Sequence, residues 1–464
     1  MDFKTEIMKI KYIISAILLT GLLSCSEDFT DLSPISQRNA GIFYKTAGDM
    51  QVAVNAIYNA LKEPGCYNQS YWVIQELRSD NTFWDGTGLA EEITVFDKFT
   101  DISTSDITED AWNDSYLGIS RANIVLDRID GVEMSSAQRD QLTGEALFLR
   151  SLYYYHLAVA FGNIPMVLNE PTSVSEGQDH RQVTASAIYS QLVSDLSLAE
   201  SNLPQSYGSA DLGRATKGAA GTLLAKVYLT IGDNANAEAA LRRVMGYGYS
   251  LVSDYADLWG VENEHNSESI FEVEFEGGFG DQGNVFTNQF HGDLSASVTS
   301  GQRNIPERDL IEAYEDGDLR FAASLEGVTD DNTGWPIKYG TSNSFSEDDA
   351  ANNWVVFRYT DVLLMLAEAL GEGTEAYDLI NQVRSRAGLG SIDASTAGSF
   401  SEKLLQERRV ELAFENHRWA DLLRFGAAEA TMSAQNKPVN GKLLFAIPQR
   451  ELDLNSSFTQ NPGY

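Results

Sequence analysis

Apolar residues recur every three or four positions over most of the chain, a spacing that predicts α-helix. The first such segment follows Thr46 and Asp49, a T-x-x-D capping pattern ahead of apolar positions from Val52 to Leu61. We predict further helices at 109–130, 136–161, 185–203, 216–231, 235–247, 360–371, 374–387 and 401–425. Glycines suited to helix C-termini follow several of them: Gly162, Gly232, Gly371 and Gly388.

Strand patterns are scarce. Residues 270–275 alternate between apolar and polar side chains, and residues 443–447 form a short apolar run. The fold class that we predict is therefore mostly α.

One helix pair has a recognisable spacing. The inner positions of a tetratricopeptide pair are reproduced by Leu224, Ala225, Tyr228, Gly232-Asp233, Ala237 and Leu241. Looser pairs occur at 140–203 and 358–387, without a fixed period. We predict an α-helical scaffold of tetratricopeptide-like pairs packed into one body, not a regular solenoid.

Three long insertions interrupt these helices, at 63–108, 165–184 and 276–357. They are rich in Gly, Asn, Asp, Ser, Thr and aromatic residues. Irregular segments longer than about 15 residues are usually binding elements or disordered, and the aromatic residues favour binding. We therefore expect long, irregular, loop-rich insertions with a few short strands.

The amino-acid composition argues against two classes of protein. Among 464 residues, 67 Asp and Glu outnumber 33 Lys and Arg, giving a formal charge of −34. Such a balance argues against a nucleic-acid partner, because phosphate binding needs a basic surface. The 7 Trp, 20 Tyr and 21 Phe argue against an unfolded chain.

The N-terminus predicts export. Lys9 and Lys11 precede an apolar run of about 12 residues, which suits a signal peptide and is too short to span a bilayer. The run ends in Leu-Leu-Ser-Cys25, which looks like a lipobox, so we predict a signal peptide at 1–24 and lipidation of Cys25. Two alternatives remain: an unmodified Cys25 after an ordinary signal peptide, or a Cys25–Cys66 disulfide. The lipid would be the only membrane anchor, since no later stretch of 18 or more apolar residues occurs.

The sequence was searched for catalytic and cofactor-binding motifs, and none is complete. Residues 278–283 match G-x-G-x-x-G, but the residues that follow do not make an amphipathic helix, which a dinucleotide site requires. No two of the five His residues stand at zinc-ligand spacing, and no G-x-S-x-G occurs. An acid–base pair of carboxylates remains open, because such a pair has no sequence signature. We predict no catalytic residue, no cofactor and no metal ligand.

The charged segment 407–424 carries Glu407, Glu411 and Glu415 at helical spacing with several arginines. We interpret it as a ladder of ion pairs joining one helix to its neighbours, with Trp419 in the core.

Further motifs follow one another along the chain: the lipobox with Asp28-Phe-x-Asp-x-x-Pro34, 144–155, 161–165, 188–196, Leu203-Pro204, 215–220, 358–369, 381–389, the charged segment, 448–452 and 460–464. Taken together, these segments resemble the SusD/RagB family of surface glycan-binding lipoproteins, from end to end of the chain.

The resemblance implies four tetratricopeptide-like pairs on one side and an irregular binding region on the other. It implies a non-enzymatic lipoprotein at the outer face of the outer membrane, which delivers oligosaccharide to a SusC-like TonB-dependent transporter barrel. Some relatives capture peptides, so a peptide ligand is one alternative and a surface glycoside hydrolase is another. We divide the chain into a signal peptide (1–24), a lipidated leader (25–45), an N-terminal SusD-like region (46–264) and a C-terminal SusD/RagB region (265–464).

The insertions supply what a sugar site needs, namely aromatic rings for the apolar faces of sugars and polar side chains for their hydroxyls. We predict Trp84 and Trp335 as stacking platforms, with a buried loop anchor as the alternative for each tryptophan, and Asn81, Asp85 and Arg303 as hydrogen-bonding residues. Further candidates are Tyr67, Phe279 and Tyr339. The other tryptophans are predicted to pack inside: Trp72, Trp112, Trp259, Trp354 and Trp419. The acidic charge favours a neutral glycan over a polyanionic one.

Overall fold

The computed structural model describes residues 43–84, 91–171, 173, 180–279, 282–292, 303–340 and 349–464. The predicted signal peptide, Cys25 and most of the leader lie outside the described residues. Cys66 is buried and forms no disulfide with any of the described residues. Within the described part of the chain, no helix is long and apolar enough to cross a bilayer.

The helices predicted between residues 46 and 387 are confirmed, each beginning within three residues of its expected start. They are α2 (Ala47–Ala60), α5 (Asp106–Arg128), α6 (Ser136–Phe161), α8 (Ala185–Asn202), α9 (Lys217–Thr230), α10 (Asn234–Met245), α14 (Tyr359–Leu370) and α15 (Thr374–Arg386). Thr46 and Asp49 form the expected capping box. The four C-terminal glycines adopt φ between 69° and 78°, a left-handed conformation that glycine adopts without strain.

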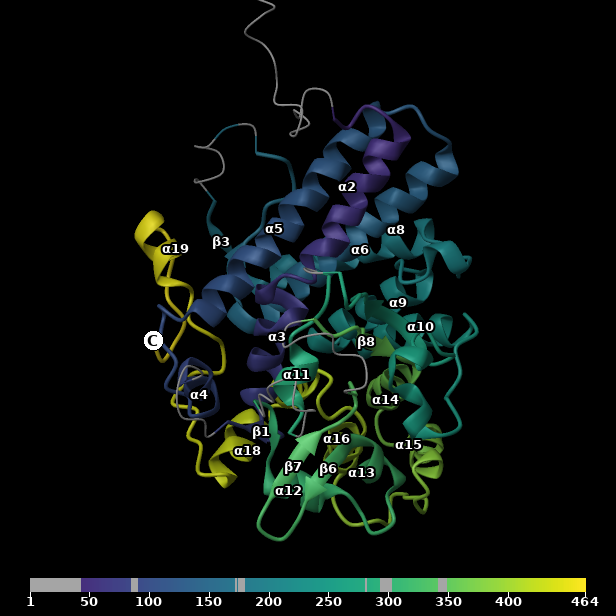
Figure 1. The fold of residues 1–464 in the computed structure, drawn as a ribbon, viewed down its shortest axis with the longest axis vertical. Coiled ribbons are helices and arrows are strands. Elements are labelled where there is room, and N and C mark those ends of the chain that lie inside the picture. Colours follow the sequence, from purple (N-terminus) through teal and green to yellow (C-terminus); the bar gives the residue numbers. More distant parts are fainter. Residues whose placement is uncertain are drawn as a thin grey trace, which may run out of the picture.

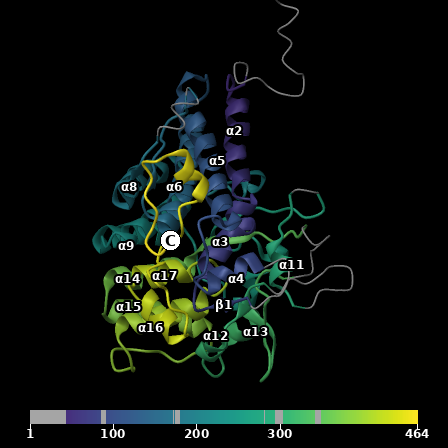
Figure 2. The same ribbon diagram turned by 90° about the vertical axis from the view of Figure 1, so that its left-hand side faces the viewer.

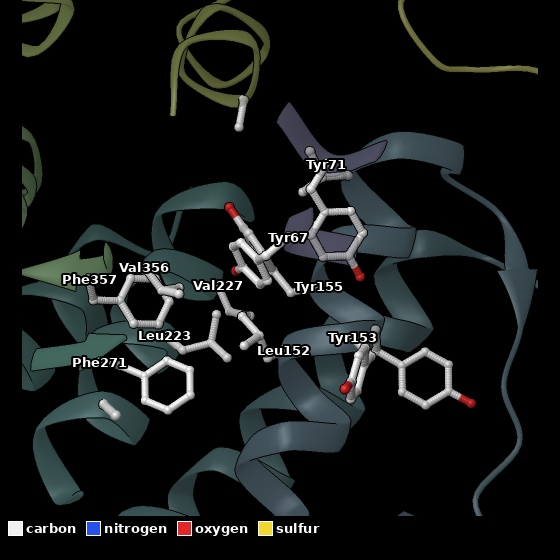
Figure 3. Close-up of a cluster of buried hydrophobic side chains, with 14 of the residues drawn as sticks. Tyr67, Tyr71, Leu152, Tyr153, Tyr155, Leu223, Val227, Phe271, Val356 and Phe357 are labelled. Atoms are coloured by element: carbon white, nitrogen blue, oxygen red, sulfur yellow. The ribbon is translucent and has the colours of Figure 1, made fainter. Parts of the chain in front are cut away.

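These helices stack in chain order. Helix α2 packs on α5, α5 on α6, α6 on α8, and the series continues through α9, α10, α14 and α15. Figure 1 shows α2, α5, α6 and α8 together at one end of the molecule, with α9, α10, α14 and α15 beyond them. The mostly α scaffold of helix pairs is therefore confirmed. Its interior is aromatic: Tyr67, Tyr155, Phe271 and Phe357 lie near one another where α6, α9 and the strands meet (Figure 3).

Short antiparallel strand pairs complete the fold. Strand β1 (Thr82–Phe83) pairs with β5 (Ile305–Pro306), and β2 (Ile164–Pro165) with β3 (Gln182–Val183). Strand β4 (Ser269–Val273) pairs with β8 (Trp354–Arg358), and β6 (Leu325–Val328) with β7 (Thr333–Pro336). The strand predicted at 270–275 is confirmed as β4.

Shorter helical segments fill the connections: η2 (Pro64–Asn68), α3 (Ser70–Trp72), η3 (Val73–Leu77), α4 (Glu91–Asp97), η4 (Ile129–Gly131), η5 (Ser209–Asp211), η6 (Tyr255–Leu258), η7 (Val261–Asn263), α11 (Phe286–Phe290), α12 (Arg308–Ala313), α13 (Leu319–Ser324), α18 (Ala428–Ala434) and α19 (Gln449–Leu454). The expectation of an irregular first insertion is thus corrected: much of it is helical, and residues 70–82 are buried.

Two local predictions were wrong. The helix expected at 401–425 is broken into α16 (Phe400–Glu411) and α17 (Arg418–Arg424), because Phe414 and Asn416 turn the backbone at φ of 69° and 65°. Residues 443–447 form no strand. Phe445, Ala446 and Ile447 are buried, and the Phe445 N–H donates to the Ala160 carbonyl of α6 at 2.8 Å.

The charged segment 407–424 forms buried ion pairs, as interpreted from the sequence. The Glu411 carboxylate accepts from Arg358 at 2.6 Å, from Arg320 at 3.1 Å, and from Arg386. These arginines come from β8, α13 and α15, so the ion pairs join α16 to three other elements. Trp419 is completely buried, as expected.

Candidate functional site

Strand pairing brings three of the predicted site residues into one region, although they are far apart in the sequence. In the β1–β5 pair, Phe83 lies opposite Ile305, and the same register continued places Trp84 opposite the residue that follows Arg303. Strand β5 also contacts β7, which carries Trp335. Figure 1 shows β1 and β7 at the same end of the molecule, and Figure 2 shows α11 on the side away from α8 and α9.

Trp335 is half-buried and rests against two glycines. A Cβ atom added to Gly292 would lie 2.1 Å from the indole ring, and one added to Gly327 would lie 2.4 Å from it. Gly327 also has a φ of 71°, which disfavours any other residue. The His291 ring lies 5.8 Å away, centroid to centroid. This cradle fixes the plane of the indole while leaving part of it exposed.

Trp84, Arg303 and Phe279 have exposed surface as well. Trp84 follows β1 directly, is half-buried and packs partly on the main core. Arg303 is half-buried, and its backbone N–H donates to the Gln289 carbonyl at 2.6 Å, which ties it to α11. Phe279 is the most exposed large apolar residue in the described part of the chain, at 66%.

Three of the predicted binding residues lie in the interior, so the structure does not support direct ligand contact for them. Asn81 is fully buried, and its amide bonds to Glu76 and Arg409. Tyr67 is 1% exposed and its hydroxyl bonds to His156 at 2.8 Å. Tyr339 is 4% exposed and stacks on Trp354 at 4.8 Å. Asp85 lies outside the described residues.

The tryptophans assigned to packing are all buried. Their exposed fractions are 0% for Trp72, Trp354 and Trp419, 3% for Trp112 and 9% for Trp259. Trp84 and Trp335 are therefore the two tryptophans of the described residues that are not fully buried.

Buried charged groups hold the residues that precede β1. Burial alone would raise the pKa of Asp80, but the Arg418 and Arg409 guanidinium groups hold that pKa below its ordinary value. Burial raises the pKa of Glu76 to about 7, even though Asn416 and Asn81 donate hydrogen bonds to its carboxylate. The backbone that leads to Trp84 is thus fixed by charge-assisted hydrogen bonds.

The glycine cradle around Trp335 was not predicted from the sequence. Gly292 and Gly327 are separated from Trp335 by 43 and 8 positions, and neither glycine belongs to a motif. The β6–β7 pairing, which sets Trp335 opposite Glu326, is what brings Gly327 beneath the ring. The one available signal was the high glycine content of the third insertion.

Two cavities lie away from Trp84 and Trp335. One of about 600 Å³ is lined by Tyr155, Tyr189 and Leu443 among others, and one of about 360 Å³ is lined by Trp112, Phe458 and others between α5 and α19. Neither is lined by Trp84 or Trp335. We take the surface that carries Trp84, Arg303 and Trp335, called the tryptophan surface below, as the candidate site, because strand pairing brings these three predicted residues into one region.

One cluster has the composition of a metal site. Ligand atoms of His265, Glu272 and Glu274 lie within 4.8 Å of one another. Glu272 accepts from the His265 backbone at 3.1 Å and from the Asn353 amide at 3.0 Å, and the His265 ring lies 3.3 Å from Glu274. The bond to Glu274 is the main cause that raises the pKa of His265 to about 9. A protonated His265 thus accounts for the cluster, and we assign no metal to it.

Known proteins share this architecture. Residues 28–229 match a family described as "Starch-binding associating with outer membrane", and residues 321–464 match one described as "SusD family". A solved "Laminarin binding SusD-like protein" is 30% identical and superposes with a TM-score of 0.82 over 91% of this chain and all of that one. The chain belongs to the SusD family. The resemblance inferred from the sequence is therefore confirmed.

Other SusD-family members match over similar lengths. "SusD-like protein P25" of Formosa agariphila is 28% identical over 98% of this chain and 100% of its own. "Surface glycan-binding protein A" from Bacteroides uniformis is 25% identical, with a TM-score of 0.78 over 90% of this chain and 99% of that one. These relatives are named as SusD-like or glycan-binding proteins, and none of these names denotes an enzyme.

Proposed function

We propose that this chain captures a neutral glycan on the face that carries Trp84, Arg303 and Trp335. The observation that supports this most is the pairing of β1 with β5, whose register leads Trp84 toward the segment of Arg303, together with the contact of β5 with β7, which carries Trp335. Half-exposed indole rings suit the apolar faces of pyranose rings, and a guanidinium suits their hydroxyls. Phe279, which is exposed, is a further proposed contact.

The ligand that we propose is a laminarin-like β-glucan. The solved relative named for laminarin binding is 30% identical over nearly the whole chain. A formal charge of −34 disfavours polyanionic glycans at low salt, which is consistent with a neutral ligand.

The proposal also includes the location of the protein in the cell and its partner protein. A signal peptide (1–24) and a lipid on Cys25 within the leader (25–45) would hold residues 46–264 and 265–464 at the outer face of the outer membrane. There the protein would pass its glycan to a SusC-like TonB-dependent transporter, without cleaving it. The matched family description, which names the outer membrane, supports this location.

The test is affinity electrophoresis of the purified protein in gels containing laminarin, starch or the polyanion alginate. We expect laminarin to retard migration, alginate to have no effect at low salt, and no reducing ends to appear during incubation with laminarin. Release of reducing ends would favour a glycoside hydrolase. Absence of retardation by every glycan, together with calorimetric binding of a peptide mixture, would favour the peptide-capturing alternative.

A further inference from the structure

Residues Asp80 and Asn81, just before β1, are held by an arginine from the far end of the chain. The Nε atom of Arg409 donates to the Asn81 Oδ1 atom at 3.1 Å, and its Nη2 atom donates to the Asp80 carbonyl at 2.5 Å. The same Nη2 atom lies 3.2 Å from the Asp80 carboxylate. A single planar guanidinium therefore bonds to the backbone of Asp80 and to the side chains of both Asp80 and Asn81.

Other bonds enclose the same two residues. Arg418 forms a bidentate pair with the Asp80 carboxylate at 2.6 and 2.7 Å. The Asn81 amide donates to Glu76 at 3.3 Å, and the Asn81 carbonyl accepts from the Glu307 N–H at 2.8 Å. Arg409 contacts the side chains of both Asp80 and Asn81, so its loss would disturb both at once.

Only Thr82 and Phe83 separate Asn81 from Trp84, and both belong to β1. A strand of two residues is too short to hold its own position against a shift at its start. The backbone direction at Trp84 therefore depends on where Asn81 is held.

We infer that Arg409 is a positioning residue for glycan binding: from α16 it holds Asp80 and Asn81, and thereby sets the place of the Trp84 ring at the surface. This inference rests on the proposed function. It gives Asn81 a supporting role in place of the ligand contact expected from the sequence. Lysine cannot replace Arg409 fully, because a single ammonium lacks the two-pronged geometry of a guanidinium.

Arg384 offers a matched control. Like Arg409, Arg384 is a buried arginine in an ion-pair network. It belongs to α15 and pairs with Glu407 of α16 at 3.1 Å and with Glu315 at 2.7 Å. Its guanidinium also donates to the Gly390 carbonyl at 2.8 Å, so its hydrogen bonds lead away from residues 80–84. A purely structural effect of losing a buried arginine should therefore appear equally in Arg384→Met and Arg409→Met.

The first test is a double-mutant cycle read out by calorimetric titration with laminarin. We expect Arg409→Met to raise Kd about tenfold in the wild-type background and to have no further effect in Trp84→Ala. In Trp335→Ala its effect should remain about tenfold, and Arg384→Met should leave Kd within about twofold. Additive effects of Arg409→Met and Trp84→Ala would overturn the inference, as would an equal rise in Kd for Arg384→Met. Arg409→Lys, which keeps the charge, serves in the same cycle where Arg409→Met fails to fold.

A second readout needs no ligand, so it separates this inference from the proposed function. The protein is labelled with 5-fluorotryptophan, and the ¹⁹F resonances of Trp84 and Trp335 are assigned with Trp84→Phe and Trp335→Phe. We expect Arg409→Lys to shift or broaden the Trp84 resonance and to leave that of Trp335 in place. An unchanged Trp84 resonance would overturn the inference even if the protein binds laminarin. A shifted Trp84 resonance in a protein that binds no glycan would instead contradict the proposed function alone.

Discussion

Replacing Glu411 by Gln is expected to lower the free energy of unfolding by about 3–5 kcal/mol, because it removes the charge that three buried arginines share. Gln keeps the shape of the side chain, so the loss comes from uncompensated guanidinium charge and not from a cavity. For a chain of this length, the melting temperature should fall by roughly 5 °C. Differential scanning calorimetry measures both quantities.

Glu238→Gln is the control, because Glu238 also pairs with an arginine, Arg242, but both side chains of this i, i+4 pair are exposed. Exposed ion pairs contribute at most about 1 kcal/mol, so this variant should melt close to the wild type. Equal melting temperatures for the two variants would contradict the importance of the buried network.

The same network sets the response to acid. Burial alone would raise the pKa of Glu411, but Arg386, Arg358 and Arg320 hold it well below its ordinary value, near 4.5 in the unfolded chain. Its contribution to stability is therefore complete above about pH 4.5 and is lost as the pH falls toward the folded-state pKa. The difference in stability between wild type and Glu411→Gln should accordingly shrink below pH 4.5, and a constant difference would contradict this assignment.

Trp335→Ala is expected to raise Kd for laminarin by about 30-fold or more, since loss of a stacked indole costs about 2 kcal/mol or more. The melting temperature should stay within a few degrees of the wild type, because Trp335 is only half-buried. Calorimetric titration and a thermal melt of the same sample separate the two effects.

Phe458→Ala is the control, because Phe458 is a half-buried ring that lines the 360 Å³ cavity between α5 and α19. It should leave Kd unchanged. If Phe458→Ala abolished binding and Trp335→Ala did not, the site would lie in that cavity and our assignment of the tryptophan surface would be wrong.

Helical periodicity predicted the scaffold well, because the signals for a helix and for its two ends lie close together in the sequence. The capping box at Thr46 and the glycines at 162, 232, 371 and 388 mark helix ends within a few residues of the apolar pattern itself. The break between α16 and α17 could not be predicted in this way, since the pattern continues through Phe414 and Asn416 and only their positive φ values reveal the turn.

The site was harder to predict because it depends on contacts between distant segments. Residues 82–83 pair with 305–306, and neither dipeptide has a sequence feature that predicts this pairing. Trp84 and Trp335 were identified as candidates because they lie in insertions that combine aromatic rings with hydrogen-bonding side chains. Asn81 was chosen on the same grounds, yet its amide faces Arg409 inside the protein. Polar residues beside a site serve the ligand or the fold, and sequence alone does not separate these roles.

The most direct test of the central claim is a crystal structure of the protein with a laminarin hexasaccharide. We predict sugar rings stacked on the indole faces of Trp84 and Trp335, with the Arg303 guanidinium within hydrogen-bonding distance of a hydroxyl. A hexasaccharide bound with neither tryptophan in contact would contradict the proposed site.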